Sequence, residues 1–257
     1  MPSWDPDLYE RFKAYRDRPA LDLLLQVPAD LEPREIWDLG CGTGEHAAVL
    51  AARHPAARVH GLDSSPDMLR RARARAVEVD WVQADITGFA PETAPDLIFS
   101  NAALQWATDH AMLFPRLASS LAPDGVLACQ MPVAHNSDWH RALRELAAEP
   151  IWAERLGGVG GVQPVAAPDR YYDWLSPLCG EVDIWTTTYL HVLEGDDPVV
   201  DWMRGTALRP YLDVLTNPSA REAFLEDYRG RVRAALPPRA DGTTLLPFPR
   251  LFILARR

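Results

Sequence analysis

A short apolar strand that runs straight into a glycine-rich turn is the feature that most constrains this chain. Residues Glu35 to Leu39 have the pattern of a buried strand, and Gly40-Cys41-Gly42-Thr43-Gly44 follows them without a spacer. Glycine tolerates left-handed backbone, so such a turn lets the main chain approach a ligand closely at the N-terminus of the next helix. This arrangement predicts a βαβ unit with a ligand crevice at the carboxyl ends of the strands.

The rest of the first half alternates between strand and helix patterns. This alternation is typical of a parallel sheet covered on both faces, and it predicts a doubly wound α/β fold. Ser65 has the side chain of an N-cap, and Pro66 suits a first helical position. We predict helices over Gly44 to Arg53, Pro66 to Ala76 and Asp109 to Leu121, and strands over Val59 to Leu62, Val79 to Val82, Leu97 to Ser100 and Val126 to Met131.

The second half predicts two closing strands and a helical cap. Val182 to Val192 and Leu251 to Leu254 are strand-like, which gives a mostly parallel, seven-stranded Rossmann-like sheet. Pro198 to Leu215 and Ser219 to Leu236 are helix-like, and the glycines at 157–161 indicate a loop that is either a lid or a connection. We expect a single domain over residues 1–257, with a cofactor-binding core at 30–135 and a cap and substrate region at 1–29 and 150–245.

Composition and charge narrow the class of partner. A net charge of −10 repels nucleic acid and anionic membranes, so we expect neither as a partner. There is no apolar run long enough to span a membrane and no basic leader, so we expect a cytoplasmic protein. Cys41, Cys129 and Cys179 are too few and too widely spaced for a disulfide framework or a zinc cluster, so we predict reduced thiols and no metal.

Two acidic residues beside the glycine turn restrict the cofactor. A dinucleotide fingerprint requires Gly or Ala at the position of Glu45, and a carboxylate there also opposes a pyrophosphate. Asp38 precedes the turn, where an acid repels phosphate but attracts an ammonium group directly or through water. Both acids favour a cofactor without phosphates, while a nicotinamide oxidoreductase and a non-catalytic binding protein for an adenosyl ligand remain as alternatives.

Acids at the ends of the next two strands predict a nucleoside site. Asp63 closes the second strand, where a carboxylate accepts hydrogen bonds from both ribose hydroxyls. Asp85 ends the third strand and is either an acceptor for an adenine amino group, with Ile86 on the ring, or a helix or turn cap. Met68 is either a cover for the other face of adenine or a core side chain.

Together these motifs resemble those of class I S-adenosylmethionine-dependent methyltransferases over residues 35 to 131. The resemblance implies S-adenosyl-L-methionine as cofactor and S-adenosyl-L-homocysteine as product. The residues after the fourth strand, Asn101 to Trp106, lack the Asn/Asp-Pro-Pro-Tyr/Phe motif of nucleic-acid amino-methyltransferases. The cofactor-binding residues that the resemblance implies are Asp38, Gly40, Cys41, Gly42, Gly44, Asp63, Ser64, Met68, Asp85, Ile86 and Asn101.

A closer resemblance, to the trans-aconitate 2-methyltransferase family, extends over nearly the whole chain. Its first-half motifs are Asp38-Leu39-Gly40-Cys41-Gly42, Asp63-Ser64-Ser65 and Asn101-Ala102-Ala103-Leu104-Gln105-Trp106. The chain departs from it at Thr43-Gly44-Glu45-His46-Ala47, where the family more often has Pro-Gly-Asn-Ser-Thr, and this affects the methionine end of the cofactor. In the second half the shared motifs are Trp185-Thr186-Thr187-Thr188-Tyr189, Trp202, Gly205-Thr206, Leu208-Arg209-Pro210, Leu246-Pro247-Phe248 and Arg250-Leu251-Phe252.

The resemblance implies monomethyl esterification of a carboxylate on trans-aconitate or a similar small polycarboxylate. A carboxylate is ionised at neutral pH, so its attack needs no general base, and we expect no acid or base residue. Gln105 and Trp106 are expected beside the transferring methyl group, and Arg209 and then Arg18 to hold the other carboxylates, because arginine binds them in pairs. A methyltransferase with another small acceptor, a malonyl thioester or a secondary metabolite, remains the alternative. Lesser candidates are Arg204 and Arg250 as carboxylate ligands, Tyr9, Tyr15 and Tyr228 as hydroxyl donors, and His110 as a neutral polar contact; Trp4, Trp185 and Trp202 are expected in the core.

Overall fold

The computed structural model describes residues 13–159 and 165–257. They form two compact units, which we call the sheet unit and the helical unit. The sheet unit comprises the described parts of Arg18–Pro132, Gln163–Thr187 and Arg250–Arg257. The helical unit comprises those of Met1–Asp17, Val133–Val162 and Thr188–Pro249. Tyr9 and Trp4 lie outside the described residues.

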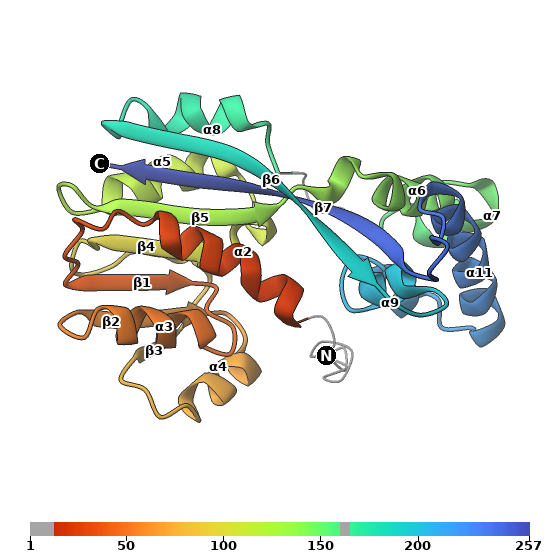
Figure 1. Ribbon diagram of the computed structural model, residues 1–257, viewed down its shortest axis with the longest axis horizontal. Coiled ribbons are helices and arrows are strands. Elements are labelled where there is room, and N and C mark those ends of the chain that lie inside the picture. The colour runs from red at the N-terminus through yellow and green to blue at the C-terminus, as the bar shows by residue number, and fades with distance from the viewer. Residues whose placement is uncertain (1–12, 160–164) are drawn as a thin grey trace. The chain divides into compact units, whose positions relative to one another are not determined.

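A seven-stranded sheet has the strand order β3-β2-β1-β4-β5-β7-β6 (Figure 1). All pairs among the first five strands are parallel, and β7 pairs with β5 in antiparallel register, with Val126 opposite Arg256 and Pro132 opposite Arg250. The reversal of strand order at β1 and β4 is the topological switch point, where α/β sheets of this kind bind ligands. The strands are β1 Glu35–Leu39, β2 Arg58–Asp63, β3 Asp80–Gln83, β4 Leu97–Asn101, β5 Val126–Pro132, β6 Glu181–Leu193 and β7 Thr244–Arg256.

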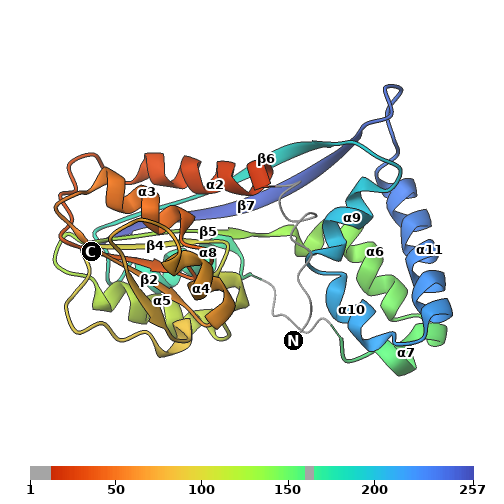
Figure 2. The ribbon, with the colours of Figure 1, turned by 90° about the horizontal axis from the view of Figure 1, so that it is seen from below.

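Helices cover both faces of the sheet, as expected for strands that are buried on both sides. Helices α2 (Lys13–Gln26) and α3 (Glu45–Arg53) lie on the opposite face from α5 (His110–Ser120), as Figure 2 shows. Helix α5 packs against α8 (Pro168–Leu175) through Phe114 and Tyr171, whose ring centroids are 4.7 Å apart. Helix α4 (Pro66–Arg73) packs against β2 and β3, and its N-cap Ser65 accepts a hydrogen bond from the Met68 amide.

The helical unit has a core of its own. Its helices are α6 (Asp138–Ala147), α7 (Pro150–Leu156), α9 (Pro198–Arg204), α10 (Arg209–Val214) and α11 (Pro218–Ala235). Their apolar faces, with parts of β6 and β7, bury aromatic side chains that include Trp139, Trp202 and Phe248. Tyr228 is fully buried there and donates its hydroxyl to the Trp139 carbonyl. Short 3₁₀ turns complete the described chain at η1 (Ile86–Gly88), η2 (Leu104–Trp106) and η3 (Ala134–Asn136).

The sequence predictions hold best in the parallel sheet. Every predicted strand is present, and the last two complete the sheet as expected. The prediction of one continuous helical segment over Pro198 to Leu215 is wrong, because a turn at residues 205–208 separates α9 from α10. The predicted strand over Leu251 to Leu254 is too short, since β7 begins at Thr244. Helices α6, α7 and α8 were not predicted. Among the described residues, no helix is long and apolar enough to cross a membrane.

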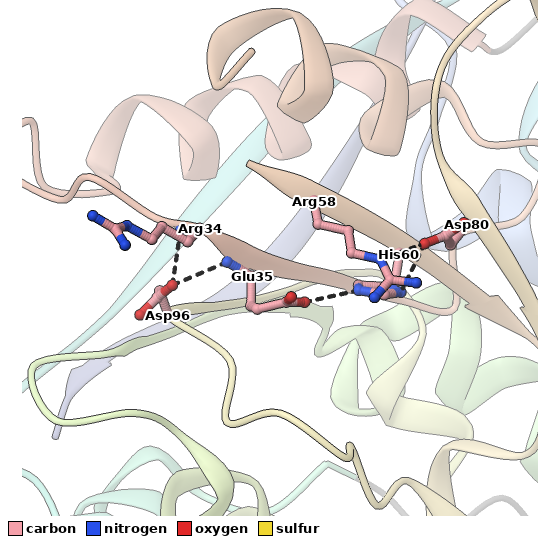
Figure 3. Close-up of polar contacts among 6 residues, drawn as sticks. All are labelled: Arg34, Glu35, Arg58, His60, Asp80 and Asp96. Carbon is pink, nitrogen blue, oxygen red and sulfur yellow. Dashed lines mark hydrogen bonds and ion pairs between the residues drawn. The ribbon is translucent and has the colours of Figure 1, made fainter. Parts of the chain in front are cut away.

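A cluster of polar side chains lies at the amino ends of the strands (Figure 3). Asp96 Oδ2 accepts hydrogen bonds from the backbone amides of Arg34 and Glu35, at 2.7 and 2.9 Å. The Glu35 carboxylate in turn contacts His60 Nε2 at 2.8 Å, and Arg58 pairs with Asp80 at 2.7 Å. These contacts fix the start of β1 at the edge of the sheet opposite to the glycine turn.

Candidate active site

The glycine turn after β1 has the left-handed backbone that its sequence predicts. Gly40, Gly42 and Gly44 have φ values of 75°, 54° and 79°. The amides of Gly40 and Cys41 both donate to the Leu62 carbonyl, at 2.7 and 3.0 Å. A Cβ on Gly40 would lie 2.1 Å from Ala103 Cβ, so only glycine fits between this turn and the chain that follows β4.

A tryptophan that the sequence analysis did not single out supports this turn. A Cβ on Gly44 would lie 2.4 Å from the Trp81 ring, and one on Gly61 would lie 2.5 Å from the same ring. Two glycines on different elements therefore make room for one indole on β3. The repeated glycines of the motif give no sign of this partner, because the contact joins positions far apart in the sequence.

Asp38 is a buried acid directly before the turn. Its side chain is 1% exposed, and its Oδ2 has no hydrogen-bond partner. The pKa of Asp38 is raised to about 7, chiefly by burial and further by the Asp63 charge, against a lowering by the hydrogen bond from the Ala47 amide. A buried carboxylate oxygen without a donor is costly, and a bound cation would supply the missing partner.

Asp63 anchors the turn from the end of β2. Its Oδ2 accepts from the Gly42 amide at 2.9 Å, and its Oδ1 accepts from the Ser65 amide at 2.8 Å. An ionised carboxylate has about four lone-pair sites, so acceptor capacity remains for the two hydroxyls of a ribose. Ser64, between these contacts, is exposed. The residues at this edge thus fit a nucleoside that carries an ammonium group.

Asp85 caps the turn that follows β3. It is exposed, and its Oδ1 accepts from the Thr87 amide and hydroxyl, at 2.7 and 2.5 Å, which lowers its pKa. The capping role that the sequence offered as an alternative is therefore present, and the other carboxylate oxygen keeps its capacity to accept. Ile86 and Met68 are both half-buried.

The segment after β4 forms a tight, polar connection. Asn101 Oδ1 accepts from Gln130 Nε2 at 2.5 Å, and Ala102 has a left-handed φ of 51°. Gln105 donates Nε2 to the Ala102 carbonyl at 2.6 Å, while its buried Oε1 has no partner. Trp106 is 64% exposed. Gln105 thus has an unused acceptor, and the Trp106 ring is uncovered. Their roles in the methyl-transfer site stay predictions.

The expectation for Glu45 needs a correction. The charge argument expects its carboxylate to oppose a pyrophosphate, but Glu45 pairs with Arg75 at 3.0 Å, and Arg75 also donates to the Thr43 carbonyl. The charge of Glu45 is thereby offset. Glu45 therefore disfavours a dinucleotide cofactor only by its size, since a glutamate replaces the small residue that close packing of helix and strand requires there.

His110 lies at the first turn of α5 with both ring nitrogens engaged. Nδ1 contacts the Tyr171 hydroxyl at 2.6 Å, and Nε2 contacts the Leu104 carbonyl at 2.9 Å. Burial lowers the pKa of His110, so the ring is neutral at pH 7. This is the neutral polar contact that the sequence predicts. It also identifies Tyr171 as a partner that the sequence analysis missed.

The predicted arginines differ in their surroundings. Arg18, in the sheet unit, is exposed and pairs with Asp22 at 3.9 Å, and Arg204 is exposed. Arg250 is 4% exposed. Arg209, in the helical unit, is half-buried with Asp213 at 3.9 Å, and its buried Nη2 has no hydrogen-bond partner.

The aromatic candidates are mostly structural. Tyr15 donates its hydroxyl to the Val192 carbonyl at 2.6 Å and Tyr228 to Trp139, so neither is a ready donor to a carboxylate. Trp202 is 2% exposed, as expected for the core, and Trp185 is half-buried in a stack on Phe252.

Known proteins resemble this chain over its full length. Residues 36–125 match the family model of the methyltransferase domain. A trans-aconitate 2-methyltransferase of Methylobacterium radiotolerans is 48% identical over 260 residues, covering 100% of this chain and 99% of the relative. One from Azoarcus sp. is 46% identical over 257 residues and covers 100% of both. The chain belongs to the trans-aconitate 2-methyltransferase family.

A solved structure has a similar fold. The crystal structure of the YcgJ protein from Bacillus subtilis superposes with a TM-score of 0.62 over 93% of this chain and 98% of that chain. With 14% identity, this likeness shows the Rossmann-like fold alone. The similarity to trans-aconitate 2-methyltransferases, by contrast, extends through the helical unit and confirms the family that the motifs of both halves predict.

Proposed function

We propose that this protein is an S-adenosylmethionine-dependent O-methyltransferase that forms a monomethyl ester on a carboxylate of trans-aconitate or a similar small polycarboxylate. The observation that carries the proposal is the 48% identity to a trans-aconitate 2-methyltransferase, which covers 100% of this chain. Since the aligned length includes the helical unit, the similarity is not limited to the cofactor-binding core. The domain organisation proposed is one functional methyltransferase, with its core at 30–135 and its cap and substrate regions at 1–29 and 150–245.

The buried Asp38 and the glycine turn fit the proposed cofactor. Asp38 Oδ2 lacks a partner and suits the ammonium of the methionine moiety, and Asp63 suits the ribose hydroxyls. Asp85 and Ile86, with Met68, are proposed to hold the adenine. When bound, S-adenosyl-L-methionine supplies the methyl group, whose bond to sulfur breaks, with its electron pair left on sulfur, as the bond to a carboxylate oxygen forms. Gly40, Cys41, Gly42, Gly44, Ser64 and Asn101 complete the proposed cofactor set.

We propose that the residues around the methyl acceptor position it and do not transfer protons. A carboxylate is already ionised at pH 7, so its attack needs no general base. His110 has both ring nitrogens engaged and is not proposed as one. Gln105 and Trp106 are proposed to position the reacting carboxylate and to shield it from water, which favours a reaction that cancels charge. Arg209 is proposed to hold a second carboxylate, and Arg18 is the next candidate.

Methyl transfer across a panel of di- and tricarboxylates tests the acceptor. We expect ester formation from trans-aconitate at a higher kcat/KM than from the other acids. Turnover of a malonyl thioester or another acceptor, with none of trans-aconitate, would identify the alternative methyltransferase. Calorimetry against NAD separates the oxidoreductase alternative, since we expect binding of S-adenosylhomocysteine and none of NAD.

The remaining expectations on partners concern what the protein does not bind. Its net charge of −10 supports the prediction that it binds neither nucleic acid nor an anionic membrane. The described residues contain no cluster of three metal-ligating side chains. A cytoplasmic location and the absence of a metal stay predictions, and the oligomeric state has no prediction.

A further inference from the structure

Arg144 on α6 is a half-buried cation without an acidic partner among the residues that the structure describes. The other half-buried arginines of the helical unit each have a carboxylate within 4 Å: Arg209 has Asp213, Arg229 has Asp197, and Arg231 has Glu149. An arginine removed from water is normally paired, so an uncompensated one in a protein of net charge −10 needs a physical explanation.

The contacts of Arg144 fix one side of its guanidinium and leave the other open. Nη1 donates to the His135 carbonyl and lies 3.1 Å from His140 Nδ1 and 3.5 Å from the His140 carbonyl. Among the described residues, nothing accepts from Nε or Nη2. These two groups form the side-on edge of a guanidinium, which binds both oxygens of one carboxylate. The protein thus orients the side chain and keeps its bidentate edge unused.

The two histidines beside Arg144 add no competing charge. Their ring centroids are 5.8 Å apart. Burial, the Arg144 charge and His135 together lower the pKa of His140 to about 4. Burial and the Arg144 charge also lower the pKa of His135. Both rings are neutral at pH 7. Because His140 Nδ1 accepts from Arg144, its proton sits on Nε2, which makes that nitrogen a donor with no acceptor among the described residues.

Helix α10 carries Tyr211, a further hydroxyl donor whose pKa responds to the Arg144 charge. The Arg144 charge opposes the rise in pKa that burial causes at Tyr211, so the phenol lies within the field of the guanidinium. Tyr211 is two residues from Arg209 on this helix. A positive side chain, a neutral imidazole donor and a nearby phenol are the groups that recognise a carboxylate.

We propose that Arg144, held by His135 and His140, is an anchoring subsite for a carboxylate of the substrate that does not react. The inference rests on the proposed function, because it supposes an acceptor with more than one carboxylate. It assigns the specificity for polycarboxylates to a residue on α6, in addition to the Arg209 candidate on α10. Arg144 takes no part in bond making, so its loss should weaken substrate binding more than it slows the bound complex.

Arg144→Gln tests this subsite, with Arg141→Gln as the matched control. Arg141 is on the same helix, is exposed, and pairs with Asp138 and Glu145 at 2.6 and 3.6 Å. Calorimetry measures trans-aconitate binding in the presence of S-adenosylhomocysteine, which prevents turnover. We expect at least a ~10-fold higher Kd for Arg144→Gln. The Kd of Arg141→Gln should stay within about twofold.

A second variant, Arg144→Lys, and a comparison of the changes in KM and kcat complete the test. Lysine keeps the charge but not the forked donor pair, so Arg144→Lys should recover part of the affinity, and KM should change more than kcat in both variants. The Kd for S-adenosylhomocysteine and the melting temperature report whether either variant has lost its fold. Wild-type affinity for trans-aconitate in both Arg144 variants would overturn the inference. Binding to the wild type without turnover contradicts the proposed function instead, and no binding to the wild type overturns both.

Discussion

At the scale of single residues, Asp38 should couple cofactor affinity to pH. Its pKa is raised to about 7, chiefly by burial, so the carboxylate that we propose to bind the ammonium group is largely protonated below that pH. We expect S-adenosylmethionine to bind about five- to tenfold more weakly at pH 6 than at pH 7.5. Calorimetry at the two pH values measures this ratio. In Asp38→Asn the affinity should be low at both, and a pH-independent Kd in the wild type would contradict the assignment.

Asp38 should also destabilise the cofactor-free protein. Because its folded-state pKa lies above its usual value of 3.8, the folded state binds more protons than the unfolded chain between about pH 4 and pH 7. The contribution of protonated Asp38 to the free energy of unfolding is therefore complete below pH 4, and it is lost as the pH rises through 7. At pH 7.5, Asp38→Asn should therefore increase the free energy of unfolding by roughly 1–3 kcal/mol. Equal melting temperatures for the cofactor-free wild type and variant would disprove this cost.

The contact between Gly40 and Ala103 can be tested with a compensating pair. Gly42→Ala adds a methyl group in open space at a left-handed φ, so it should cost about 1 kcal/mol of stability. Gly40→Ala adds the same backbone cost and a clash at 2.1 Å, so it should cost at least roughly 3 kcal/mol. Gly40→Ala with Ala103→Gly should recover the difference in denaturant titrations. No recovery would mean that the close approach is not the cause.

Candidate residues could be proposed from the sequence where their position in the local motif suggests a role, but not where their contacts join distant parts of the chain. Asp38 and Asp63 follow from their positions at strand ends beside a glycine turn. Trp81 and Arg75 could not be predicted, because they meet the turn only after β3 and α4 have packed. Arg144 was missed as well, because the lack of an acidic partner among the described residues becomes apparent only in the folded chain.

At the scale of elements, Asp96 ties the start of β1 to the chain before β4. Asp96→Ala leaves the amides of Arg34 and Glu35 without their acceptor, so we expect a loss of about 1–3 kcal/mol of stability. Asp80→Ala removes an exposed ion pair with Arg58 and should cost less than about 1 kcal/mol. Urea unfolding of both variants measures the difference. Cofactor affinity should stay at the wild-type value in Asp96→Ala, since these contacts lie at the opposite end of β1.

The same scale shows which elements the sequence could determine. Parallel strands buried on both faces are short apolar runs between turn signals, so β1 was predicted at its observed ends and β5 to within one residue. Helices α6 and α7 are short and lie before a glycine-rich stretch, and their helical pattern was overlooked. In Pro198 to Leu215, the apolar spacing continues across Gly205, which concealed the break between α9 and α10.

At the scale of the whole molecule, charge and similarity restrict the acceptor in different ways. A net charge of −10 opposes every anion at long range, so a polycarboxylate needs local cations, for which Arg209 and Arg144 are the proposed residues. The fold alone does not select an acceptor, because the same sheet supports many functions. The proposed substrate class depends on the family resemblance, which extends beyond the glycine turn into the helical unit.

The most direct test of the account is the product formed from trans-aconitate and methyl-labelled S-adenosylmethionine at pH 7.5. Mass spectrometry of the purified reaction should show one labelled methyl group per trans-aconitate, and alkaline hydrolysis should release it, as expected for a monomethyl ester. Omitting the protein, or heating it beforehand, should leave the acid unmodified. An unlabelled acid after incubation with folded protein that binds S-adenosylhomocysteine would contradict the central claim.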